Sequence, residues 1–108
     1  MSILSMVRGD TADFRVTLTD ASGAELPLGS LGLTFTARHG PLTITKTVGF
    51  GVTVTDASGG IATVRIEPAD TTSIEDRTIF TWDLEVRDGA VVQTPLSGEL
   101  LVEMDVTW

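Results

Sequence analysis

Residues 79–87 carry the strongest strand pattern in the chain. Four large apolar residues occupy every second position: Phe80, Trp82, Leu84 and Val86. In an extended strand these side chains share one face, while the polar residues between them share the other. The Asp88-Gly89 that follows is typical of a tight hairpin turn, because both residues tolerate the positive φ that such a turn needs. The hairpin predicts a β fold with Trp82 at the centre of its core.

Several other segments alternate in the same way, and turns rich in Gly, Pro and Asp separate them. The further segments predicted as strands are residues 1–7, 13–20, 31–38, 42–48, 52–55, 61–66, 90–94 and 99–108. One turn of helix or 3₁₀ is predicted within residues 68–76, where Thr72 and Glu75 have capping-box spacing and Asp70 is an alternative N-cap. If seven or eight of these segments form strands, then with one helical turn they predict an all-β protein, an antiparallel immunoglobulin-like β-sandwich with residues 1–108 as a single domain.

Composition limits the partners of the chain. Its 108 residues include 15 acidic and 7 basic ones, which gives a formal net charge of -8. Such a charge repels phosphates and anionic lipid headgroups, so we expect neither nucleic acid nor a membrane as partner. The apolar start of the chain is too short for a signal peptide or a membrane span, which predicts synthesis in a cytoplasm.

Motifs that could carry chemistry have simpler structural interpretations. Arg8-Gly9-Asp10 matches a tripeptide that integrins recognise, yet Gly-Asp also suits a bend between strands, which we favour. His39 is the only histidine and cysteine is absent, so a zinc site or a nucleophilic triad lacks partners. The pairs Glu75/Asp76 and Glu103/Asp105 stand in no pattern that predicts a pocket. We therefore expect no enzymatic activity, cofactor, metal or small-molecule substrate.

Calcium is the alternative that stays open. Several aspartates lie near predicted strand ends and could converge at one pole: Asp20, Asp56, Asp70, Asp76 and Asp88. Oxygen ligands of this kind suit Ca²⁺. Turns and caps use aspartate as well, which is the interpretation we favour.

The apolar ends of the chain are the best candidates for contact with other subunits. The residues predicted to make these contacts are Ile3, Leu4, Met6, Val7, Val106 and Trp108. Apolar ends on an acidic domain suggest burial against a neighbour. Packing of both ends on the domain's own core is an equal alternative.

Several short motifs occur in order along the chain: Arg8-Gly9-Asp10-Thr11, residues 16–23, residues 31–35, Gly59-Gly60, Pro68-Ala69-Asp70-Thr71, residues 80–86, residues 98–102 and Asp105-Val106-Thr107. Together they resemble small immunoglobulin-like β-sandwich virion proteins of tailed bacteriophages, including the N-terminal module of baseplate upper proteins. The resemblance implies a non-enzymatic structural protein located in the virion, attached to head or tail and in contact with other virion subunits in many copies. Larger members continue past this ending, which predicts a stand-alone accessory subunit here. The alternatives are a carbohydrate- or receptor-binding adhesion module, for which Phe50 and Trp108 are the plausible exposed aromatics, and an immunoglobulin-like repeat of a bacterial adhesin.

Overall fold

The computed structural model describes residues 2–19, 22–29, 31–89 and 91–104. Its strands are β1 (Ser2–Val7), β2 (Ala12–Thr17), β3 (Gly32–His39), β4 (Leu42–Val48), β5 (Gly51–Asp56), β6 (Ile61–Ile66), β7 (Thr78–Asp88) and β8 (Val91–Glu103). The one helix within these residues is the single turn α1 (Pro68–Thr71). The prediction of an all-β protein with one helical turn is confirmed.

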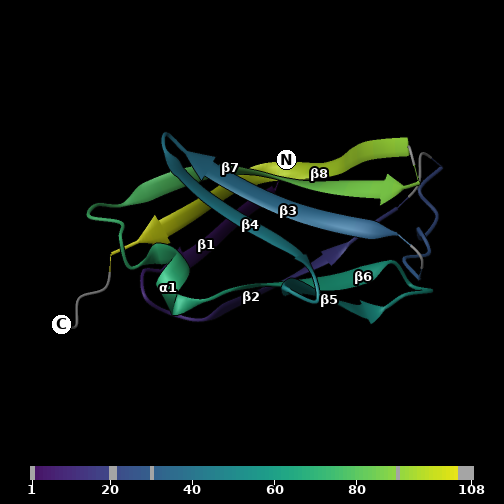
Figure 1. Cartoon of the computed structure of the whole chain (residues 1–108), viewed down its shortest axis with the longest axis horizontal. Helices are drawn as coiled ribbons and strands as arrows, with labels where there is room; N and C mark the ends of the chain where they lie inside the picture. Colours follow the sequence, from purple (N-terminus) through teal and green to yellow (C-terminus); the bar gives the residue numbers. More distant parts are fainter. Residues whose placement is uncertain (1, 20–21, 30, 90, 105–108) are drawn as a thin grey trace.

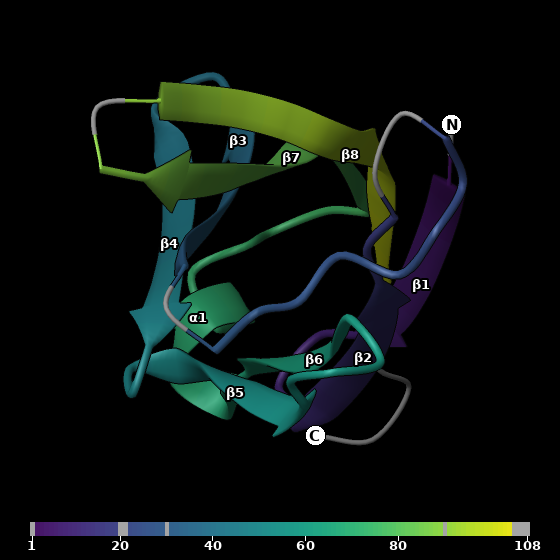
Figure 2. The same cartoon turned by 90° about the vertical axis from the view of Figure 1, so that its right-hand side faces the viewer.

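The eight strands form one mixed sheet in the order β1-β8-β7-β3-β4-β5-β6-β2. Most neighbours pair antiparallel, but β1 runs parallel to β8 and β4 runs parallel to β5. A purely antiparallel sheet was therefore the wrong expectation. The sheet curls until it is nearly barrel-shaped, with its two edge strands, β1 and β2, on the same side of the molecule (Figure 2). The turn of α1 lies at one end of this barrel and the β7–β8 hairpin at the other (Figure 1).

The sheet turns a corner between β4 and β5. Phe50 N donates to Thr47 O at 2.8 Å, and Thr47 N donates to Phe50 O at 3.2 Å, which closes a tight turn. Gly49 has a φ of +87° there and Gly51 one of +104°, conformations in which only glycine is unstrained. The glycines at 49 and 51 therefore allow the chain to bend. Strands β4 and β5 pair at only two positions there, Thr47 with Gly51 and Val48 with Val52.

Trp82 lies in the middle of the core, as the sequence predicts, with 2% of its surface exposed. Its ring stacks on Phe35 with the ring centroids 5.6 Å apart. Phe35 lies on β3 and Trp82 on the neighbouring antiparallel strand β7. Trp82 pairs with Ala37, two residues beyond Phe35. Trp82 Nε1 is buried and has no hydrogen-bond partner among the described residues.

Two local predictions were wrong in detail. The helix starts earlier than the Thr72–Glu75 spacing suggested, with Glu67 as N-cap, and Asp70 Oδ2 accepts from Glu67 N at 2.7 Å. The segments 90–94 and 99–108 were predicted as separate strands, whereas β8 continues from Val91 to Glu103. The pairing of β7 with β8 shifts register between Leu84 and Val86, so β8 continues as one strand past this point.

Candidate functional site

An exposed apolar patch lies on the outer face of β1, β8 and β7. It consists of Val7, Ile79 and Leu101, which we call the β1-edge patch. Val7 is 37% exposed, Ile79 is 47% exposed, and Leu101 is half-buried. Ile79 and Leu101 stand at outward positions, because the residues before and after them on β7 and β8 point into the core. Val7 points outward on β1, because it follows the buried Met6.

Strand register brings the patch together. Ile79 pairs with Leu101 across β7 and β8, and Leu101 pairs with Ser5 across β8 and β1. Val7 follows Ser5 by two residues and so lies diagonal to Leu101 on the same face. Directly opposite residues have Cβ atoms about 5 Å apart and diagonal ones about 7–8 Å. The three apolar side chains are therefore neighbours on one surface, directly beside an edge strand.

Charged residues flank the patch. Arg77 Nε lies 3.3 Å from Glu103 Oε1, and Glu103 is the pairing partner of Val7. Glu99 stands on the same face of β8, opposite Thr81. An apolar centre with a polar and charged rim is the usual anatomy of a protein–protein interface.

The turn after β1 holds that strand in place. Arg8 Nη1 donates to Ile74 O at 3.1 Å, and Gly9 N donates to the buried Thr71 Oγ1 at 2.9 Å. Arg8 N also donates to Glu103 O at 2.8 Å. These bonds tie Arg8-Gly9-Asp10 to α1 and β8, which supports its interpretation as a structural turn.

The predicted contact residues differ in where the structure places them. Met6 is buried and Leu4 is half-buried against the core, so these side chains serve the domain's own packing. Val7 is exposed. The backbone of Ile3 pairs with Glu99, but its side chain lies outside the described part, as do Val106 and Trp108. The contact with other subunits itself stays a prediction.

Ile79 and Leu101 were missed by the sequence analysis. The signal was present, because Ile79-Phe80 and Leu100-Leu101-Val102 each place apolar residues on both faces of a strand. Only the register shows that these two breaks in alternation fall opposite each other.

The other candidate residues that the structure describes make ordinary structural contacts. His39 is exposed, with Nδ1 3.1 Å from Ile79 O and its ring edge-on to Phe80. Asp56 Oδ1 accepts from Gly59 N at 3.0 Å, which is ordinary turn chemistry, and Asp20 lies outside the described residues. Within the described ranges no three His, Cys, Asp or Glu side chains come close enough to hold a metal ion.

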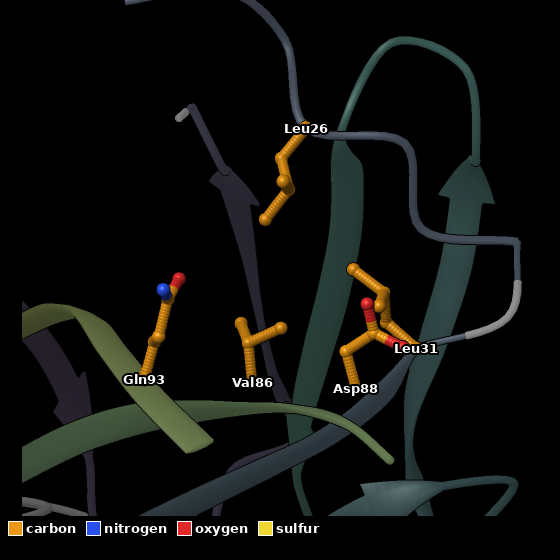
Figure 3. Close-up of a pocket in the computed structure, with 5 residues that line it drawn as sticks. All are labelled: Leu26, Leu31, Val86, Asp88 and Gln93. Atoms are coloured by element: carbon orange, nitrogen blue, oxygen red, sulfur yellow. The ribbon is translucent and has the colours of Figure 1, made fainter. Parts of the chain in front are cut away.

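A small hollow opens beside the β7–β8 hairpin (Figure 3). It is lined by the apolar Leu26, Leu31 and Val86 and by the polar Asp88 and Gln93. Figure 3 shows Leu26 approaching from the opposite side to the other four. Its volume is about 110 Å³. It is small by comparison with pockets for drug-sized ligands, which usually measure roughly 300–1,000 Å³.

Comparisons with known proteins give no assignment. No protein-family model matches the sequence, and no curated protein is similar enough to match it. Among the described residues, no helix has the length and apolar character needed to cross a bilayer.

Proposed function

We propose that this chain is a non-enzymatic structural subunit of a tailed-phage virion, attached to the head or tail through the edge strand β1 and the β1-edge patch. The observation that carries the proposal is the patch itself. Three adjacent strands expose apolar residues at the same place on their outer face, and one of them, β1, has a pairing neighbour on one side only among the strands that the structure describes. The resemblance to phage virion proteins supplies the class of partner, other virion subunits in many copies.

The expected contact is weak when it is made once. Complete burial of a Val, Leu or Ile side chain stabilises by about 1.5–3 kcal/mol. The patch residues are already half-buried or more, so burying all three adds only about 2–4 kcal/mol. Main-chain hydrogen bonds from a partner strand added to β1 would strengthen the contact. On a symmetric particle many copies of this contact would act together, so that a weak single contact would be sufficient for stable attachment.

We further infer that the nearly barrel-shaped sheet is an immunoglobulin-like sandwich. The strand sequence β8-β7-β3-β4 corresponds to G-F-C-C′ of an immunoglobulin variable domain, and β2-β6-β5 corresponds to B-E-D. The corner at residues 49–51 then marks the passage from one layer to the other. The first strand of the chain, β1, pairs with the outer edge of β8, the strand equivalent to G. The single turn α1 falls between the strands equivalent to E and F.

Substitution within the patch tests the attachment surface. The double variant Ile79→Thr/Leu101→Thr places β-branched threonine, which suits strands, at both positions but removes apolar contact area. A matched control, Val48→Thr/Val92→Thr, changes two exposed apolar residues outside the patch. Quantitative mass spectrometry of purified particles should show a loss of the patch variant and normal incorporation of the control, with equal thermal stability. Equal incorporation of both variants would overturn attachment through the patch.

A further inference from the structure

Unpaired backbone groups line the open edge of β1. This strand pairs with β8 alone among the strands that the structure describes. Arg8 N donates to Glu103 O at 2.8 Å, so the peptide N–H at this position faces β8. The N–H and C=O groups of successive strand residues point to opposite sides. Those of Ile3, Ser5 and Val7 therefore face away from β8.

The turn after β1 limits the open stretch to Ile3 and Ser5. Asp10 N donates to Val7 O at 3.1 Å, which places the turn beside Val7. Within the described part of the chain, no backbone group bonds to Ile3 or Ser5 on the side away from β8. Both residues therefore offer an N–H donor and a C=O acceptor to a further strand.

The sequence of β1 lacks the features that usually protect an edge strand. Natural edge strands avoid association through charged side chains, proline or bulges. The other edge strand, β2, follows this rule, since Asp13 and Arg15 are exposed on it. Residues 2–7, which form β1, include no charged residue and no proline. The open edge of β1 is therefore suited to accept another uncharged strand.

We propose that the open edge of β1 pairs with β1 of a second copy of this chain, antiparallel and about a two-fold axis. Each copy carries a formal charge of -8, so two copies approach most easily where the surface is uncharged. Of the two edge strands described, β1 is uncharged and β2 is charged. A two-fold contact closes on itself, and the joined sheet then ends on both sides in the protected strand β2.

The open backbone groups determine the register of this pairing. When Ile3 of each copy lies opposite Ser5 of the other, each such pair exchanges both of its N–H···O bonds. Leu4 then lies opposite Leu4 of the second copy, in a pair without hydrogen bonds. Leu4 is half-buried against its own core, so contact with its counterpart covers more of its apolar side chain. This register uses all the open groups and keeps Ile3 of the second copy away from the turn beside Val7.

The pairing deepens the proposed function, on which its role in a particle rests. The partner strand added to β1 is then that of a second copy. Directly opposite residues of antiparallel strands share a face, so the β1-edge patches of the two copies lie on the same side of one continuous sheet. The pair therefore presents twice the apolar area for attachment to the head or tail.

Sedimentation equilibrium of the full chain over a range of concentrations tests the pairing without phage particles. Ser5→Pro removes an N–H that faces away from β8, so pairing within the domain is kept. Thr17→Pro on β2 is the matched control, because Leu18 N donates to Gly60 O and the N–H of Thr17 therefore faces away from β6. Ser5→Lys and Thr17→Lys form a second matched pair, which keeps the N–H but adds a charge at an exposed position. Thermal melts confirm that all four variants are folded.

A cysteine substitution tests the register, since the chain has no cysteine of its own. Opposite residues in an antiparallel pair without hydrogen bonds have Cα atoms about 4.5 Å apart, which is within the range of a disulfide. Leu4→Cys should therefore form an intermolecular disulfide on mild oxidation. Ser5→Cys is the control, because Ser5 is exposed but lies opposite Ile3 and not opposite its own counterpart.

The wild type should show a monomer–dimer equilibrium. Ser5→Pro and Ser5→Lys should each weaken dimerisation about tenfold or more, because each change acts twice, once in each copy. The Thr17 variants should stay within about twofold of the wild type. A chain that is monomeric at every concentration, equal dimerisation of the Ser5 and Thr17 variants, or faster cross-linking of Ser5→Cys than of Leu4→Cys would each overturn the pairing. Absence of the chain from phage particles would instead overturn the virion assignment alone.

Discussion

Lys46 Nζ lies 2.6 Å from Asp70 Oδ2, and this ion pair joins β4 to α1 across one end of the barrel. The two side chains are only 12% and 23% exposed. The same carboxylate oxygen accepts from Glu67 N, so one aspartate both caps the helical turn and neutralises an inward-facing lysine. Inward-pointing lysines are typical of sheet edges. Here β4 lies between β3 and β5, and Asp70 makes the inward charge of Lys46 tolerable.

Replacement of Asp70 by Ala should destabilise the fold by about 2–4 kcal/mol, because it leaves the lysine ammonium mostly buried without its partner and removes the cap of α1. Urea unfolding measures the change. The double variant Lys46→Met/Asp70→Ala should cost less than the sum of the two single variants. If the destabilisation of the double variant equals the sum of the two single variants, Lys46 and Asp70 have no coupling energy.

Thr71→Val should cost about 1–3 kcal/mol, because valine keeps the shape of threonine but leaves the Gly9 N–H without its acceptor. The neighbouring Thr72 is exposed and offers a matched control. Thermal unfolding should show a clear loss for Thr71→Val and little change for Thr72→Val. Equal effects would contradict the anchoring role of Thr71 for the turn after β1.

Gly60→Ala should be far more costly than Gly23→Ala, although both glycines have positive φ, +71° and +87°. A Cβ at Gly60 would lie 2.5 Å from Leu18 O, whereas one at Gly23 would meet nothing within 4 Å. Backbone strain alone costs about 1–2 kcal/mol, and overpacking adds about 1–3 kcal/mol at Gly60. Chemical denaturation of both variants separates the two contributions, and similar stabilities would refute the close approach.

The pKa of Asp13 should lie below its ordinary value of 3.8, chiefly because Arg65 donates hydrogen bonds to the carboxylate. Since the folded-state pKa is lowered, the contribution of the pair to stability is fully present above the unfolded pKa and is lost as the pH falls through the folded one. It should therefore be constant at neutral pH and disappear only below about pH 4. NMR titration of the Asp13 carboxyl carbon should show a higher midpoint in Arg65→Gln than in the wild type. An unchanged midpoint would mean that the pair does not form in solution.

Local patterns were enough to predict the main elements of the fold. Strict alternation around Trp82 identified β7 and its inward face, and the segment 68–76 indicated one helical turn, although its N-cap was predicted too late in the chain. Such signals depend on residues close in sequence.

Features that depend on distant partners could not be predicted. The parallel pairing of β1 with β8 joins the two ends of the chain, and no local pattern encodes it. The β1-edge patch follows from that pairing, since the outward positions of Leu101 and Val7 become neighbours only across β1 and β8. The partner of Lys46 likewise lies in an element 24 residues away.

Immunogold electron microscopy of phage particles purified from the source, with antibody to this chain, tests the virion assignment most directly. The proposal predicts gold on the particles, scattered over the head for a decoration protein or gathered at one tail end for a baseplate or tail subunit. Particles without gold, and without the chain by mass spectrometry, would contradict it.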